Sequence, residues 1–322
     1  MNRFEWVAAT SLDEAVAQLS SGAVAKAGGI DLLDRMKEGI DAPNRLVNLR
    51  AIPGLDRIEP LAGGVAIGPL VTMAALAASP EIAAQWPALA RAAGKAATPQ
   101  IRNAATVGGN LLQRPRCWYF RSAEFPCLKK GGGECFGIPG DNRYHSIFGN
   151  GVCAAVHPSS AAVPLMAYGA KLELAGPRGR REVPIETFFV HPDDDVLREH
   201  SLGAGEVLAA IRLPAPAKGA RSAYLEQGEK ESFDWPLADA AAVLEMDGPL
   251  VRRASLVLGA AAPVPMRARA AEEFLRGKRI DPATAREAAR IAMQGATPLE
   301  KNEYKVALFH AVIARTLVAA AG

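Results

Sequence analysis

Apolar and polar positions in the first fifty residues alternate between helix-like and strand-like spacing. The tetrapeptide Ser11-Leu12-Asp13-Glu14 has the form of a capping box, and Ala15, Val16 and Leu19 behind it lie on one face of a helix. The following pattern predicts a strand, a tight turn, a helix and a strand at residues 23–27, 28–29, 31–38 and 45–49. We therefore expect a small α/β unit that ends near Pro53-Gly54.

The spacing of apolar residues and the positions of proline and glycine predict two further units in the rest of the chain. Strands are expected at residues 65–68, 171–175 and 207–213, with helices at 72–78 and 89–97. A linker rich in proline and glycine follows at residues 214–219. Beyond it we expect strands at 238–246 and 254–259 and helices at 267–276, 282–293 and 303–321. The predicted units are 1–54, 55–215 and 216–322.

An irregular insertion at residues 114–153 interrupts the second unit. It holds all four cysteines, Cys117, Cys127, Cys135 and Cys153, in the pattern C-x₉-C-x₇-C-x₁₇-C. The pattern lacks the C-x₂-C pair of most structural zinc sites and the C-x₂-C-x₂-C run of bacterial ferredoxins. Four thiolates suit zinc or a four-iron cluster, and disulfides are the third alternative. We expect a bound metal centre to order this loop, with its surplus of basic residues offsetting the thiolate charge.

Composition narrows the class of protein. Apolar residues make up 49% of the 322 and charged residues 22%, which is enough to bury a large core. The net charge of +3 does not indicate a dedicated nucleic-acid binder. No apolar run approaches the roughly 20 residues of a membrane span, and the N-terminus lacks the order of a secretory signal. We expect no membrane insertion and a cytoplasmic location, with export alongside a signal-bearing partner as the alternative.

Two glycine segments are candidates for ligand binding. The turn 26–32 lies between a predicted strand and helix, where backbone N–H groups and the helix dipole favour a pyrophosphate; Asp31 is expected to cap the helix. The segment 100–110 is expected to be a turn that offers several donors to one ligand. Ordinary turns are the alternative for both. The five histidines show no metal-ligand spacing, and no catalytic acid, base or nucleophile set can be assembled.

Taken together, these segments resemble the FAD-binding medium subunit of the xanthine dehydrogenase and carbon monoxide dehydrogenase family of molybdenum hydroxylases. The resemblance rests on Ala27-Gly28-Gly29-Ile30-Asp31-Leu32, on Ala105 to Asn110, on Ile211-Arg212-Leu213-Pro214 and on Ala254 to Ala268. It implies an α+β fold: a two-lobed FAD-binding domain of the vanillyl-alcohol-oxidase (PCMH) kind and a C-terminal α+β flavoprotein domain. Lobe 1 would be residues 1–54, lobe 2 residues 55–215 and the C-terminal domain residues 216–322.

The resemblance also assigns residues to cofactors. Those expected at FAD are Ala25, Lys26, Ala27, Gly28, Gly29, Ile30, Asp31, Leu32, Thr106, Gly108, Gly109, Asn110, Ser160 and Glu226. The insertion resembles the flavin subunits of 4-hydroxybenzoyl-CoA reductase and periplasmic aldehyde oxidoreductase, in which this loop holds a [4Fe-4S] cluster. By that resemblance the four cysteines are its ligands.

The chain departs from the family at two of these positions. Ser160 stands where the family often has an aspartate, and Glu226 stands where it often has a lysine that approaches the flavin. A carboxylate at position 226 could accept from the flavin ring N–H, but would not stabilise a reduced anionic flavin as a lysine does.

The implied function is electron transfer without substrate chemistry on this chain. A molybdenum-cofactor large subunit and a [2Fe-2S] small subunit would be the partners, and electrons would pass between the [2Fe-2S] clusters and an external acceptor through FAD. A reductive enzyme of the 4-hydroxybenzoyl-CoA reductase type is the alternative within the family. From other classes, the alternatives are a zinc-stabilised scaffold and a self-sufficient flavin oxidase. Trp118, Tyr119 and Phe120 are expected either to form a docking patch or to pack over the cluster.

Overall fold

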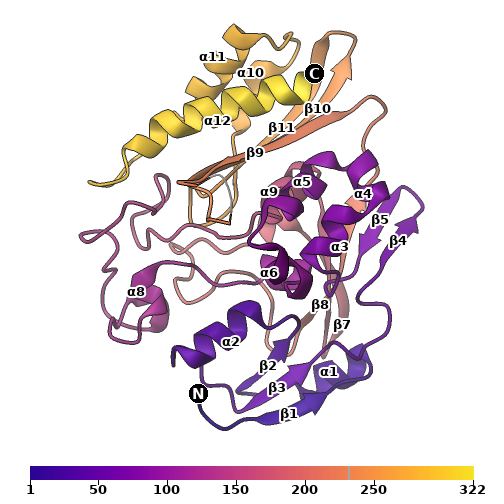
Figure 1. The fold of residues 1–322 in the computed structure, drawn as a ribbon, viewed down its shortest axis with the longest axis vertical. Coiled ribbons are helices and arrows are strands. Elements are labelled where there is room, and N and C mark those ends of the chain that lie inside the picture. The colour runs from indigo at the N-terminus through magenta and orange to yellow at the C-terminus, as the bar shows by residue number, and fades with distance from the viewer. Residues whose placement is uncertain (231–232) are drawn as a thin grey trace.

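The computed structural model describes residues 1–230 and 233–322, and Figure 1 shows three tiers of secondary structure. Lobe 1 is the lowest tier. Its parallel sheet has the order β1 (Glu5–Ala8), β3 (Arg45–Asn48), β2 (Ala23–Lys26), with α1 (Leu12–Gln18) and α2 (Ile30–Lys37) beside it. Leu46 and Val47 on β3 are both fully buried, because Leu46 packs in the α2 cluster and Val47 in the α1 cluster.

Lobe 2 is the middle tier, built on a five-stranded antiparallel sheet. Its order is β4 (Ile58–Leu61), β5 (Gly64–Ile67), β8 (Val207–Pro214), β6 (Lys171–Gly176), β7 (Gly179–Pro184). Its helices are α3 (Met73–Ala78), α4 (Pro80–Gln85), α5 (Pro87–Lys95), α6 (Pro99–Ala104), α7 (Val107–Leu111) and α9 (Ala162–Ala167), with the short 3₁₀ turn η2 (Ile185–Thr187) after β7. The sheet and helices enclose the largest core cluster, in which Trp86 is fully buried and its indole N–H donates to Pro214 O at 3.1 Å.

The C-terminal domain is the upper tier, an antiparallel sheet with helices over its outer face (Figure 1). The strands are β9 (Arg221–Gln227), β10 (Ala238–Asp247), β11 (Leu250–Gly259) and β12 (Met266–Arg267). The helices are α10 (Arg269–Leu275), α11 (Pro282–Ala292) and α12 (Tyr304–Ala321). By length and composition α12 could cross a membrane, but its apolar residues, including Phe309, Ile313 and Leu317, pack in the core of this domain.

The cysteine insertion lies beside lobe 1 and under the C-terminal domain. It contains α8 (Trp118–Arg121), the 3₁₀ turn η1 (Leu128–Lys130) and otherwise irregular chain. Its second half is tied to the C-terminal domain: Ile147 N donates to Ala261 O at 2.9 Å, and Lys305 Nζ donates to His145 O at 3.0 Å. The second half of the insertion is thus fixed to the C-terminal domain by hydrogen bonds.

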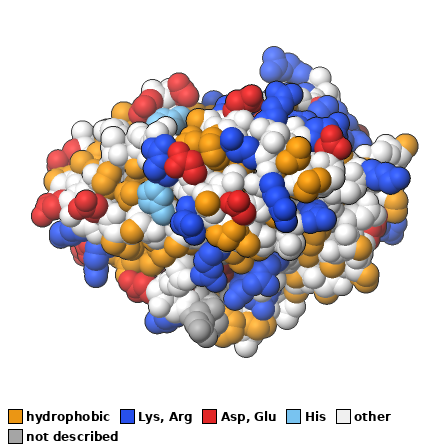
Figure 2. Space-filling model, turned by 90° about the horizontal axis from the view of Figure 1, so that it is seen from above, with side chains coloured by type: hydrophobic (Ala, Val, Ile, Leu, Met, Phe, Trp, Pro, Cys, Tyr) orange, Lys and Arg blue, Asp and Glu red, His pale blue; other side chains and the backbone are white. Residues whose placement is uncertain are grey.

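The surface above the C-terminal domain carries mixed charge. In Figure 2, Lys and Arg side chains on this face are interspersed with acidic and hydrophobic ones. This mixture agrees with the small net charge, and this face shows no broad patch of only positive or only negative side chains.

The fold is α+β as expected, but the prediction for residues 100–110 was wrong. Residues 100–110 are not a simple turn but parts of α6 and α7. Thr98 caps α6, with Pro99 at its first position, and Thr106 caps α7 by accepting from Gly109 N at 3.1 Å. The expectations also lacked β1, β4, β7, β9, β12, α4, α8 and α9.

Candidate functional site

A cavity of about 990 Å³ lies where lobe 1, lobe 2 and the C-terminal sheet meet. All residues that the sequence assigned to FAD line it: residues 25–32 from lobe 1, Thr106, Gly108, Gly109, Asn110 and Ser160 from lobe 2, and Glu226 from β9. Its size is that of a pocket for a large cofactor. The wall also includes Arg116, Glu199 and Trp235, which the sequence did not single out.

The glycine turn presents the N-terminus of α2 to this cavity. Gly29 is the N-cap, with φ 86°, and no side chain caps the helix. The first N–H groups of α2 therefore remain available for an anion. A Cβ at Gly28 would lie 2.2 Å from Ala104 O, so this glycine allows the turn to pack on α6. Lys26, at the end of β2, adds a cation to the same wall.

Asp31 does not cap the helix, contrary to the expectation, because Gly29 occupies that position and Asp31 points toward the insertion. Its carboxylate accepts from Arg121 Nη2 at 2.6 Å and from Arg114 N at 3.1 Å, and it pairs with Arg116 Nη2 at 2.9 Å. Burial alone would raise the pKa of Asp31, but the guanidinium groups of Arg116, Arg35 and Arg121 lower it below its usual value. The negative charge beside the turn is therefore neutralised within the protein.

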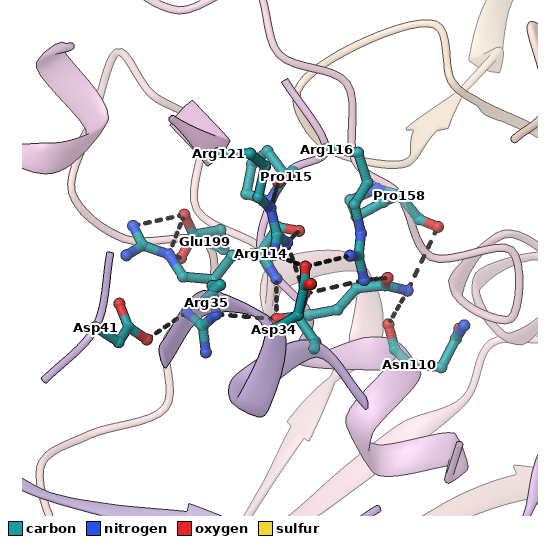
Figure 3. Close-up of polar contacts among 12 residues, drawn as sticks. Asp34, Arg35, Asp41, Asn110, Arg114, Pro115, Arg116, Arg121, Pro158 and Glu199 are labelled. Carbon is teal, nitrogen blue, oxygen red and sulfur yellow. Dashed lines mark hydrogen bonds and ion pairs between the residues drawn. The ribbon is translucent and has the colours of Figure 1, made fainter. Parts of the chain in front are cut away.

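The basic residues of the insertion form ion pairs that the sequence did not predict. Figure 3 shows Arg114, Arg116 and Arg121 converging beside Asp34 and Arg35, next to α2. Arg114 also pairs with Glu199 at 3.0 Å. Lys129, which is 5% exposed, lies 3.1 Å from Glu199 Oε1. Carboxylates thus compensate part of this basic charge. The expectation that it also offsets a tetrathiolate centre stays a prediction.

The second glycine segment contributes shape to the cavity instead of backbone donors. Gly108 N donates to Pro69 O at 2.9 Å, Gly109 N to Thr106 Oγ1 at 3.1 Å and Asn110 N to Thr106 O at 2.8 Å. The expectation of several free donors was therefore wrong for the backbone of these three residues. A Cβ at Gly108 would meet Pro69 at 2.8 Å, so the glycine permits close packing at the wall.

The side chain of Asn110 joins this segment to the stretch around Ser160. Its carboxamide oxygen accepts from Ser159 Oγ at 2.7 Å and from Ala161 N at 3.3 Å. Ser160 is buried and lines the cavity. The hydroxyl at position 160 can donate to a ligand, whereas the aspartate common in the family would add a negative charge there.

Glu226 forms the part of the wall contributed by the C-terminal domain. Burial raises the pKa of Glu226, while the Tyr224 hydroxyl, which donates to Oε2 at 2.8 Å, opposes the shift. Glu226 can accept a hydrogen bond as a carboxylate or donate one when protonated.

The four cysteines are free thiols, two of them buried and two partly exposed. Cys135 and Cys153 share a hydrogen bond, which lowers the pKa of Cys135, and burial raises the pKa of Cys117 to about 11. Cys117 Sγ lies 3.2 Å from His145 Nε2. Within residues 1–230 and 233–322, no three His, Cys, Asp or Glu side chains converge closely enough for a single metal ion. The structure thus gives no evidence for a mononuclear site, and the disulfide alternative finds no support.

The three aromatic residues after Cys117 divide between surface and interior. Trp118 is 37% exposed and packs edge-on against Tyr144, whereas Phe120 is buried under the Arg114 guanidinium. Tyr119 Oη accepts from Asp141 N at 2.7 Å. The three residues therefore do not form one exposed patch.

We expect Asp31→Asn to lower the free energy of unfolding by roughly 3 kcal/mol at pH 7, because three guanidinium groups lose their buried partner. A carboxyl whose pKa is lowered stabilises the folded state above the unfolded pKa of about 3.9, and that contribution is lost as pH falls through the lower folded value. The difference from wild type should therefore hold from pH 8 to about pH 4 and shrink below it. Denaturant unfolding across this pH range measures the difference in the free energy of unfolding.

Asp34→Asn is the control, because the Asp34 side chain is 49% exposed, against 12% for Asp31. An equal effect of both variants would contradict the role given to Asp31.

Comparison with known families agrees with this geometry. Residues 2–216 match the family described as FAD binding domain in molybdopterin dehydrogenase. Residues 223–320 match the CO dehydrogenase flavoprotein C-terminal domain. The chain belongs to this family of FAD-binding subunits, which are oxidoreductase components of molybdenum hydroxylases.

Individual relatives extend over most of the chain. The aldehyde oxidoreductase FAD-binding subunit PaoB of Escherichia coli is 36% identical, over 80% of this chain and 81% of its own length. The carbon monoxide dehydrogenase medium chain of Hydrogenophaga pseudoflava is 31% identical over 99% of this chain and 97% of its own. The structure of carbon monoxide dehydrogenase from that organism superposes with a TM-score of 0.78 over 99% of this chain and 97% of the other, at 31% identity.

Proposed function

We propose that this chain transfers electrons between [2Fe-2S] clusters of a partner and an external acceptor through bound FAD. The observation that carries the proposal is the large cavity, in which the open N-terminus of α2, Lys26 and walls from all three units converge. FAD, when bound, supplies two-electron and one-electron chemistry. The chain's own residues bind the pyrophosphate at Gly28-Gly29 and enclose the remainder of the cofactor.

The partners in this proposal are a molybdenum-cofactor large subunit and a [2Fe-2S] small subunit. Support comes from the family and from the names of the relatives, which are medium chains or FAD-binding subunits of larger enzymes. Among the residues that the structure describes, the cavity wall offers no positioned nucleophile with its own base, which supports substrate chemistry on another chain. A reductive complex of the 4-hydroxybenzoyl-CoA reductase type would use the same cavity with electrons flowing the other way.

We further propose that Cys117, Cys127, Cys135 and Cys153 hold one [4Fe-4S] cluster. All four are free thiols. A [4Fe-4S] cluster is bound by four cysteine thiolates, which is the number that the insertion supplies. The resemblance of the insertion to cluster-bearing family members supports the same assignment.

Co-purification tests the proposed function. The tagged chain, expressed with its genomic neighbours, should isolate a molybdenum-containing subunit and a [2Fe-2S] subunit, and its visible spectrum should combine flavin bands with a broad iron-sulfur shoulder. The chain alone should reduce artificial dyes only slowly. Rapid oxidation of an aldehyde or N-heterocycle by the molybdenum-free chain would contradict the proposal, and a colourless zinc protein would favour the scaffold alternative.

A further inference from the structure

A buried acidic cluster crosses from the C-terminal sheet into the large cavity. The antiparallel register of β9 and β10 pairs Asp239 with Glu226, and Tyr224 lies two residues before Glu226 on the same face. The Tyr224 hydroxyl lies 2.8 Å from Glu226 Oε2 and 3.2 Å from Asp239 Oδ2. Three ionisable side chains from two neighbouring strands therefore form one continuous hydrogen-bonded row.

The two ends of this row reach different cavities. Glu226 lines the large cavity assigned to FAD. Asp239 lines a second cavity of about 260 Å³, between the C-terminal sheet and the insertion. The wall of that second cavity includes the exposed Glu229, which brings it to the solvent side of the molecule. Tyr224 lies between them and is 1% exposed.

We propose that Asp239, Tyr224 and Glu226 form a proton relay that carries a proton from the second cavity into the FAD cavity. The Tyr224 phenol has one proton, which it donates to the nearer acceptor, Glu226. Asp239 in its acid form then donates to Tyr224 Oη. One concerted shift moves the Asp239 proton to Tyr224 and the Tyr224 proton to Glu226. Its net result is an Asp239 carboxylate and a protonated Glu226, with no change in electrons.

The surroundings of Asp239 keep a proton there at neutral pH. Asp239 is 1% exposed, and its Oδ1 has no hydrogen-bond partner in the described part of the chain. Burial first, and the charge of Glu226 second, raise the pKa of Asp239 to about 8. On β11, residue 259 is glycine, and a Cβ there would lie 2.4 Å from both carboxylate oxygens. Glycine at position 259 thus leaves space for the Asp239 carboxyl, which any larger residue there would displace.

Charged groups on the neighbouring elements act on the two ends differently. Lys305 of α12 lowers the pKa of Asp239, but its Nζ donates to His145 O and Ala260 O instead of to the carboxyl. Arg91 and Lys95 of α5 lower the pKa of Glu226. Asp234, from the segment before β10, lines both cavities. A proton is thus held more firmly at Asp239 than at Glu226, so at rest the proton of the row lies on Asp239, at the end next to the second cavity.

The relay rests on the proposed function, because it delivers its proton to the cavity assigned to FAD. Infrared spectroscopy of the purified chain tests the proton-holding step without any cofactor activity. We expect a carboxylic-acid carbonyl band at pH 7 that disappears as pH rises through about 8. Asp239→Asn should remove the band and Tyr224→Phe should shift it. Absence of such a band in the wild-type chain would overturn the relay.

Reduction of the bound flavin tests the transfer step. Rapid mixing with a chemical reductant should show roughly hundredfold slower proton-coupled reduction in Tyr224→Phe and in Asp239→Asn, at unchanged FAD content because neither residue lines the FAD cavity. Tyr168→Phe is the matched control, because this phenol is also buried near the C-terminal sheet but contacts Ser222 and Ala88 N. It should reduce at the wild-type rate.

The outcomes separate the relay from the proposed function. FAD content is measured first, by extraction. A chain that binds no FAD would contradict the proposed function, and the infrared band alone would then decide whether Asp239 holds the proton. If FAD is bound and both Tyr224→Phe and Asp239→Asn keep the wild-type rate and pH profile of reduction, the relay is wrong while the proposed function stands.

Discussion

A valine at position 29 should leave the chain folded but free of FAD. Gly29 has φ 86°, a conformation that costs a β-branched residue about 1–3 kcal/mol. The added side chain would also stand at the N-terminus of α2, where the pyrophosphate must approach the backbone. Each blocked hydrogen bond to the charged phosphate costs about 1.5–3 kcal/mol. Since each 1.4 kcal/mol is about tenfold in affinity, we expect FAD to bind roughly a hundredfold more weakly.

A matched glycine separates the strain from the blocked approach. Gly39, just beyond the other end of α2, has φ 73°, and a Cβ there would meet nothing within 4 Å. Gly39→Val should therefore suffer comparable backbone strain and keep its flavin, because Gly39 does not line the cavity. Flavin fluorescence after heat release gives the content, and thermal unfolding gives the stability. Full FAD occupancy in Gly29→Val would remove the pyrophosphate from this turn, and equal loss in both variants would attribute the effect to folding.

The sequence predicted the parts of the site that depend on local signals. A strand, two glycines and an apolar helix period are enough to place the turn of residues 26–32, and the structure has β2, Gly29 and α2 there. The helices α6 and α7 were missed although their signals are local: Thr98-Pro99 is an N-cap followed by an N1 proline, and Thr106 is a second N-cap. Both helices are too short to show an apolar period.

The polar roles were missed because they depend on contacts distant in sequence. Asp31 is 90 residues from Arg121, which binds its carboxylate, and no pattern near Asp31 distinguishes an ion-pair partner from a helix cap. Tyr224, Glu226 and Asp239 come together only through the register of β9 and β10. In the sequence, Glu226 was visible solely as a departure from the family, and nothing marked the aspartate that the same strand pair brings to it.

The insertion depends on other parts of the chain more than the sequence indicated. Arg114, Arg116 and Arg121 attach its first half to α2, and Asn302 and Lys305 bind the backbone of its second half. Metal loss was expected to disorder the insertion as a whole. These attachments should instead keep both of its ends in place, and loss of order should concentrate between Cys127 and Cys135, where Gly131, Gly132 and Gly133 lie.

If the four cysteines hold the proposed [4Fe-4S] cluster, Cys135→Ser should lose it and keep FAD. Serine preserves the size of the side chain but replaces a thiolate with a poor ligand for iron, so iron should fall well below the four atoms of an intact cluster. FAD should remain because none of the four cysteines lines the large cavity. Iron, acid-labile sulfide and flavin are measured on anaerobically purified protein, and hydrogen exchange locates the loss of order.

The exposed neighbour Glu134 supplies the control for this experiment. Glu134→Gln changes the charge next to Cys135 and leaves every thiol in place, so both iron and flavin should match the wild type. Equal loss of iron in the two variants would attribute the effect to the loop conformation instead of the thiolate. Stoichiometric zinc in the wild-type protein, prepared without oxygen, would contradict the cluster and make the cysteines a structural site. The arginine contacts on Asp31 connect the insertion to α2, whose N-terminus forms the glycine turn. A Cys135→Ser variant that lost FAD together with iron would therefore show that these contacts couple the insertion to FAD binding at the turn.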